Sequence, residues 1–193
     1  MAFAQPSLSA GRKDPVTGDP ELARVRLFDE LIERHGREIR LFLQRLCGNH
    51  HDAEELTQDV FVKAFRRLDG LRESAAARRW LYTIAVNHFN DWIKPLRRTA
   101  LRPLGDMIEE DARFASTERP SAQAMADEFS RSLGGWILAL PDRQRTVLLL
   151  HSTKGFDYLQ IGEALGITVD AVKMSLFHAR EKLRKKAERM LAP

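Results

Sequence analysis

Cysteine is almost absent from this sequence: Cys47 is the only one among 193 residues. A single cysteine cannot form an intramolecular disulfide, which favours a reducing compartment. No apolar run approaches the roughly 20 residues that a membrane-spanning helix needs. The N-terminus also lacks a basic segment followed by an apolar one, so we expect neither secretion nor membrane insertion. These absences predict a cytoplasmic protein.

No group of side chains in the sequence is typical of an enzyme. There is no glycine-rich phosphate loop and no convincing pair of nucleophile and base. Two carboxylate pairs, Glu54–Glu55 and Glu109–Glu110, are adjacent in sequence rather than convergent. We therefore expect no catalytic residue and no cofactor.

One short cluster contains potential metal ligands, namely Cys47, His50, His51 and Asp52. Thiolate and imidazole groups do bind zinc at such spacings. No second cluster of cysteine or histidine completes a tetrahedral site, however. We favour a buried cysteine at a helix end, followed by a solvated loop, and expect no metal.

Charge is distributed in blocks, although the formal net charge is only +4. Residues 97–102 and the C-terminal region are basic, whereas residues 106–128 are acidic. Blocks of opposite sign suggest that different segments bind different partners.

Strand candidates are absent, so we predict an all-α fold. Residues 1–20 contain three prolines and no hydrophobic periodicity, which predicts a disordered tail. Residues 99–124 combine two prolines with most of the acidic block and indicate a flexible acidic linker. We therefore expect two small helical domains, residues 21–98 and residues 125–193.

The first domain shows apolar residues at three- and four-residue steps, the spacing of amphipathic helices. This pattern predicts helices over residues 21–47, 52–68 and 78–96. Asp52 is the expected N-cap of the second helix. Pro95 is expected to end or kink the third.

In the second domain, the same spacing predicts helices over residues 126–140 and 142–153, followed by a pair of helices within 157–189. Gly166 lies where the turn between the paired helices needs a positive φ. Gly162 is small, so the paired helices can cross closely. Thr168 can cap the second helix of the pair.

That second helix is rich in basic residues, which include Lys173, Arg180 and Arg184. A helix-turn-helix with a basic second helix is typical of proteins that read the DNA major groove. The alternative is an ordinary helical hairpin with a solvated charged face. The small-residue, turn and apolar positions all agree with the helix-turn-helix, which favours DNA binding.

Three long segments resemble one family, the extracytoplasmic-function sigma factors. The second conserved domain of that family is similar to DAEELTQDVFVKAFRRL (residues 52–68) and RRWLYTIAVNHFNDWIKPLRR (residues 78–98). Its fourth-region domain is similar to LPDRQRTVLLLHSTKGFDYLQIGEALGITVDAVKMSLFHAREKLRK (residues 140–185). Together the two domains cover nearly all of residues 22–191 except the linker.

The resemblance implies binding to the bacterial RNA polymerase core, through the clamp helices of the β′ subunit and through the β subunit. In this family one face of the second-region helix docks on the clamp helices. The residues that match this face are Asp52, Glu55, Gln58 and Asp59.

The resemblance also implies recognition of promoter DNA at the −10 element. The loop over residues 69–77 matches the family's specificity loop, which captures a flipped base, and extruding a base costs a few kcal/mol of stacking. The helix that follows contacts the −10 region as it melts. The matching residues are Arg78, Arg79, Asn87, Asp91, Lys94, Arg97 and Arg98.

The helix-turn-helix is implied to read the −35 element through Thr168, Asp170, Lys173, Met174, Ser175, His178 and Arg180. Met174, Ser175 and His178 stand where family members often carry serine, arginine and arginine. Fewer bidentate arginine contacts to guanine are then available. Recognition is expected to rest more on phosphate contacts and DNA shape.

Two further expectations concern the linker and regulation. In the family, the linker threads toward the RNA exit path, and an anti-sigma factor commonly holds the protein inactive. The alternative function is a stand-alone helix-turn-helix repressor or activator. Such a protein should bind promoter DNA alone, whereas a sigma factor should bind it weakly or not specifically without core polymerase.

Overall fold

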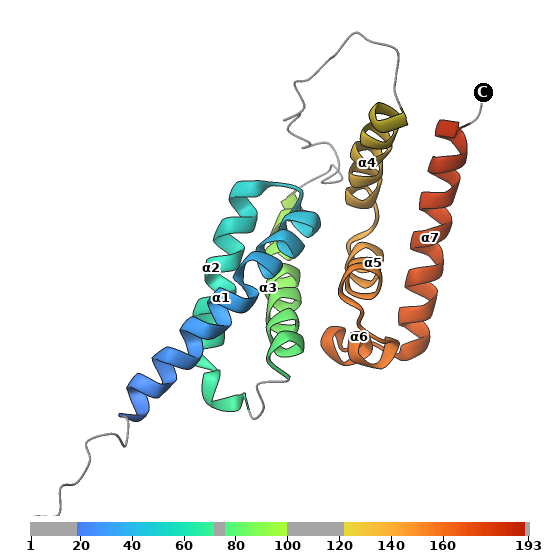
Figure 1. Ribbon diagram of the computed structural model, residues 1–193. Helices are drawn as coiled ribbons and strands as arrows, with labels where there is room; N and C mark the ends of the chain where they lie inside the picture. The colour runs from blue at the N-terminus through green and yellow to red at the C-terminus, as the bar shows by residue number, and fades with distance from the viewer. Residues whose placement is uncertain (1–18, 72–75, 100–121, 192–193) are drawn as a thin grey trace, which may run out of the picture.

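The computed structural model describes residues 19–71, 76–99 and 122–191, and the regular structure within these ranges is helical (Figure 1). The elements are α1 (Pro20–Cys47), α2 (His50–Arg66), the short 3-10 helix η1 (Leu68–Gly70), α3 (Ala77–Thr99), α4 (Ala122–Leu138), α5 (Asp142–Lys154), α6 (Tyr158–Leu165) and α7 (Val169–Leu191). The predicted all-α class is confirmed. None of the described helices is both long enough and apolar enough to cross a bilayer.

Three predicted segments fall mostly outside the described residues. They are the N-terminal tail, of which residues 1–18 are not described, the acidic linker, of which residues 100–121 are not described, and residues 72–75 of the loop before α3.

The junction between α1 and α2 differs from the prediction. Gly48 ends α1 with a left-handed conformation at φ 81°. Asn49 is the N-cap of α2, because its side-chain oxygen accepts hydrogen bonds from the backbone N–H groups of His51 (2.8 Å) and Asp52 (3.3 Å). Asp52 therefore lies in the first turn of α2, where its negative charge interacts favourably with the helix dipole. The predicted N-cap at Asp52 is wrong.

The end of α3 also differs from the prediction, in which Pro95 either ends or kinks the helix. The helix continues through Pro95 to Thr99, so the expected end at Pro95 is wrong. A proline removes one backbone donor, but the residues beyond it can still hydrogen-bond to the preceding turn. As a result, the backbone of Arg97 and Arg98 belongs to α3.

The helix-turn-helix forms from α6 and α7, as predicted. Asp157 and Gln160 form a capping box at the start of α6. Gly166, the C-cap residue of α6, has a left-handed backbone conformation with φ 64°. A Cβ at Gly162 would lie 2.9 Å from the carbonyl oxygen of Ile167, so the predicted close approach is confirmed. Thr168 accepts a hydrogen bond from the N–H of Ala171 at 3.2 Å, which confirms the predicted cap.

The helices form two groups, α1–α3 and α4–α7, which lie side by side (Figure 1). The groups pack on one another where α1 meets α4 and α5, and where α3 meets α6. The larger of two hydrophobic clusters among the described residues runs through both groups, from Ile39 and Phe89 in the first to Leu150 and Ile161 in the second. The two groups of helices therefore share one core.

Candidate nucleic-acid interface

The predicted −35 residues lie at the start of α7, and most of them share one exposed face. Asp170, Lys173, Met174 and His178 recur at three- and four-residue steps and are all exposed. Arg180 is exposed further along the helix. This arrangement presents charged and apolar side chains together on one exposed face of α7.

Ser175 does not belong to this face. Its side chain is only 8% exposed, and its hydroxyl donates a hydrogen bond to the carbonyl of Ala171 at 2.7 Å. The hydroxyl hydrogen is thus used within the helix, and burial keeps the hydroxyl oxygen away from a base edge. The structure therefore separates Ser175 from its neighbours Met174 and His178.

Phe177 is a residue of this face that the sequence analysis did not select. Its side chain is 59% exposed, close to the 53% of Met174, and its ring contacts that of His178 with centroids 5.5 Å apart. The helical period could have identified it, since Phe177 follows Met174 by three residues. Large exposed apolar side chains on a basic helix indicate a surface that is covered on binding.

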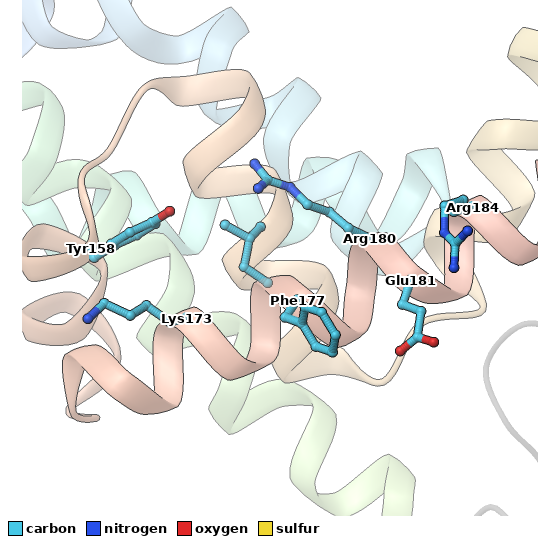
Figure 2. Close-up of a pocket in the computed structure, with 7 residues that line it drawn as sticks. Tyr158, Lys173, Phe177, Arg180, Glu181 and Arg184 are labelled. Atoms are coloured by element: carbon cyan, nitrogen blue, oxygen red, sulfur yellow. The ribbon is translucent and has the colours of Figure 1, made fainter.

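Figure 2 shows the basic side of this face, where a groove of about 350 Å³ runs along α7. Tyr158 of α6 lies at the end marked by Lys173, and Phe177, Arg180 and Arg184 follow along the helix. Arg184 is paired with Glu188 at 2.9 Å, and Lys173 with Asp170 at 3.3 Å. Both pairs are solvent-exposed, and exposed pairs contribute little to stability.

The predicted −10 residues are distributed along α3. Arg79, Asn87, Asp91 and Lys94 are exposed, and Lys94 donates to Asp91 at 2.9 Å, which lowers the pKa of Asp91. Asn87, Asp91 and Lys94 line a cavity of about 440 Å³ together with residues of α5 and α6. This part of α3 therefore faces the second group of helices.

Arg78 is placed differently from the other −10 residues. Its guanidinium donates to Oε1 of Glu38 at 3.0 and 2.6 Å, and to the backbone carbonyl of Lys154 at 3.0 Å. The hydroxyl of Tyr82 also donates to Glu38, at 2.8 Å. Partial burial opposes ionisation of Glu38, but the hydrogen bonds from Arg78 and Tyr82 prevail and lower its pKa to about 2.

The predicted polymerase-binding residues lie on α2. Glu55, Gln58 and Asp59 are exposed and Asp52 is half-buried. The carboxylate of Asp59 accepts from Nε2 of His88 at 3.0 Å, and Lys63 lies 2.5 Å from Nδ1 of the same ring. Burial and the charge of Lys63 lower the pKa of His88, which favours the neutral ring. This neutral bridge links the acidic face of α2 to α3.

Three of the potential metal ligands considered from the sequence, Cys47, His50 and His51, contact other groups in the structure. The thiol of Cys47 is buried and donates to the carbonyl of Asn49 at 3.2 Å. His50 lies 3.2 Å from Glu54 and His51 lies 3.4 Å from Glu55, each pair one turn apart on α2. No set of three potential ligands comes together in the described part of the chain.

Two family descriptions match the sequence in the order that the helices follow. Sigma-70 region 2 matches residues 31–99, which include most of α1 and all of α2 and α3. Sigma-70, region 4 matches residues 131–183, which run from α4 into α7.

Several characterised proteins are similar over most of this chain. SigW of Bacillus subtilis, an ECF RNA polymerase sigma factor, is 30% identical over 171 residues, which cover 82% of this chain and 87% of SigW. The sigma-H factor of Pseudomonas aeruginosa is 29% identical over 86% of this chain and 89% of its own length. SigE of Mycolicibacterium smegmatis is 29% identical over 87% of this chain, which spans only 63% of SigE.

Solved structures share the fold. RpoE of Bartonella quintana, in complex with the anti-sigma factor NepR, has a TM-score of 0.63 at 22% identity, over 83% of this chain and 96% of that one. CnrH, in complex with the cytosolic domain of CnrY, has a TM-score of 0.58 at 24% identity, over 88% and 94%. With both conserved regions present in order and 30% identity along most of SigW, the chain belongs to the extracytoplasmic-function family of RNA polymerase sigma factors.

Proposed function

We propose that this chain binds the core of bacterial RNA polymerase and directs it to specific promoters in the cytoplasm, while catalysing no reaction itself. The observation that carries the proposal is the presence of both sigma regions in one chain, together with an exposed polar face on α2 and an exposed basic and apolar face on α7. Each face is assigned to a different partner.

The α2 face is assigned to the polymerase. Glu55, Gln58 and Asp59 are exposed on one side of the helix, and Asp52 extends the same acidic surface toward its N-terminus. A surface of this charge suits a partner with basic groups, and electrostatic complementarity fixes orientation and speeds association. We assign the β′ clamp helices to this face, with the β subunit as a further contact of the chain.

The polar side of α3 is assigned to the −10 element. Arg79, Asn87 and Lys94 offer cations and an amide, which can hold phosphate and hydrogen-bond to unpaired bases. Arg78, Asp91, Arg97 and Arg98 belong to the same assignment.

The exposed face of α7 is assigned to the −35 element. Lys173, Arg180 and Arg184 suit phosphates or guanine, whereas Met174 and Phe177 are apolar and more than half exposed. The one apolar group on a base edge in the major groove is the thymine methyl. We therefore assign thymine recognition to Met174 and Phe177, beside the phosphate and shape contacts expected from the sequence.

A regulatory partner is part of the proposal. The two solved structures of similar fold contain RpoE with the anti-sigma factor NepR and CnrH with CnrY. By analogy, an anti-sigma factor is expected to bind this chain. Purification of the chain from its native cells should recover such a partner beside the polymerase.

Run-off transcription tests the main proposal. Purified core polymerase is incubated with fragmented DNA of the source genome, with and without the protein. Discrete new transcripts that depend on the protein support sigma function, and their upstream sequences define both promoter elements. Strong specific binding to DNA without polymerase, and no new transcripts, would favour the repressor or activator instead.

A further inference from the structure

His88 of α3 lies between two charged side chains of α2. Its Nε2 is 3.0 Å from a carboxylate oxygen of Asp59, and its Nδ1 is 2.5 Å from Nζ of Lys63. Only 11% of the His88 side chain is exposed, whereas 64% of the Asp59 side chain is exposed. A ring held inside the fold therefore contacts a carboxylate that faces outward.

The two contacts together fix the tautomer of the ring. The ammonium of Lys63 has three N–H donors and no acceptor, so Nδ1 of His88 must accept and carries no proton. The proton of the neutral ring is then on Nε2, which donates to Asp59. The hydrogen bonds run in one direction, from Lys63 through His88 to Asp59, and end on the exposed carboxylate.

The charged groups that act on the ring come from both helices. Burial and the charge of Lys63 lower the pKa of His88, whereas Asp59 and, one turn further along α3, Asp91 raise it, and the lowering prevails. Protonation would turn Nδ1 into a donor that faces the donors of Lys63, so acid should break that contact. It would also place a positive charge beside Asp59.

We propose that His88 is a positioning residue for polymerase binding, whose neutral ring holds the Asp59 carboxylate in the orientation that the polymerase contacts. The inference rests on the proposed role of the α2 face, and adds a residue of α3 to it. A carboxylate that is already oriented loses less conformational freedom on binding, so affinity rises without a new contact. A positive charge on the ring would instead weaken the attraction of Asp59 for basic groups of the partner.

Two substitutions in the full chain separate the hydrogen bonds of the ring from its titration. His88→Gln keeps an N–H donor for Asp59 and an oxygen acceptor for Lys63, but it cannot be protonated near neutral pH. His88→Leu is of similar size and offers neither group. His50→Gln, which removes an exposed histidine at the start of α2, is the matched control. Circular dichroism checks that all variants remain helical.

Affinity for purified core polymerase is measured for each protein from pH 7.5 to pH 5.5. At pH 7.5 we expect His88→Leu to bind roughly threefold to tenfold more weakly, the scale of one net hydrogen bond, and His88→Gln and His50→Gln to bind like the wild type. Below pH 6.5 the wild type and His50→Gln should lose affinity relative to His88→Gln, because only His88→Gln lacks the titrating ring. Nitrogen-15 NMR of the imidazole in the free protein should show the proton of His88 on Nε2 at pH 7.5.

The outcomes separate this role from the proposed function. Binding of His88→Leu as tight as that of the wild type would overturn the positioning role, and so would binding of His88→Gln as weak as that of His88→Leu. An equal loss of affinity in acid by the wild type and His88→Gln would assign the titration to another group and overturn the role of the neutral ring. A proton on Nδ1 would overturn the order of the hydrogen bonds. Failure of the wild type to bind core polymerase is a different result, which refutes the proposed function itself.

Discussion

At the scale of single residues, Glu38 shows how tertiary contacts change the chemistry of an ordinary side chain. Its pKa falls from 4.5 to about 2, because hydrogen bonds from Arg78 and Tyr82 overcome the effect of partial burial. A folded-state pKa below the unfolded value means that folding is favoured by ionisation. Stabilisation by Glu38 is then complete above about pH 4.5 and is lost as the pH falls toward 2.

The lowered pKa of Glu38 predicts that the stability contributed by its carboxylate depends on pH. Glu38→Gln should lower the free energy of unfolding by about 1–2 kcal/mol at pH 7, a value reduced for solvent screening of a partly exposed group. The deficit should shrink between pH 4.5 and pH 3.5. Urea unfolding at these pH values measures it, with Glu33→Gln as an exposed control on α1. A deficit that stays constant down to pH 3.5 would contradict the assigned pKa.

Met174 and Phe177 give a second prediction at this scale. Replacing thymine by uracil in the −35 element removes one methyl group per base, worth about 0.8 kcal/mol or roughly fourfold in affinity where it is buried. We expect the holoenzyme to bind uracil promoters correspondingly less well, and the holoenzyme with Phe177→Ala to lose this preference. Promoters with uracil only in the spacer are the control. Equal sensitivity in wild type and variant would remove Phe177 from base recognition.

At the scale of elements, the close approach of the backbone within the helix-turn-helix depends on Gly162, which has no side chain. A Cβ at Gly162 would meet the Ile167 carbonyl oxygen at 2.9 Å, whereas a Cβ at Gly134 in α4 would meet nothing within 4 Å. The same substitution should therefore have opposite effects at the two positions.

We expect Gly162→Ala to lower the free energy of unfolding by about 1–3 kcal/mol, since backbone must shift to admit the methyl group. Gly134→Ala should raise it by about 0.5–1 kcal/mol, because alanine loses less entropy in a helix. Urea denaturation followed by circular dichroism compares them. Equal destabilisation by both substitutions would mean that helix geometry, not the close approach, decides the outcome.

The helix-turn-helix could be predicted from the sequence because the residues that shape it are close together in the chain. The cap at Thr168, the turn at Gly166 and the small residue at Gly162 act on neighbours within a few residues. The start of α2 was less predictable, because Asn49 and Asp52 are both good N-cap residues. Which of the two residues becomes the N-cap depends on where α1 ends. The left-handed conformation of Gly48 ends α1 one residue before Asn49, so Asn49 becomes the N-cap.

At the scale of the whole molecule, the proposed function divides two partners between two groups of helices. Asp59→Arg should weaken binding to core polymerase, whereas Lys173→Ala should reduce −35-dependent initiation and leave core binding unchanged. Because Asp59 contacts His88 at the surface, its replacement should cost less than about 1 kcal/mol of stability. Core binding by pull-down and initiation in run-off assays separate the effects. The reverse pattern would refute the division.

By itself, the sequence determined the helical class, the order of the helices, and the turn and the Thr168 cap of the helix-turn-helix. These properties follow from periodicity and from residues close together in the chain. Only the tertiary structure decided that Ser175 turns inward, that Phe177 is exposed, and that Glu38 meets Lys154 across 116 positions. Such contacts depend on how whole helices pack, and no local pattern encodes which faces will meet.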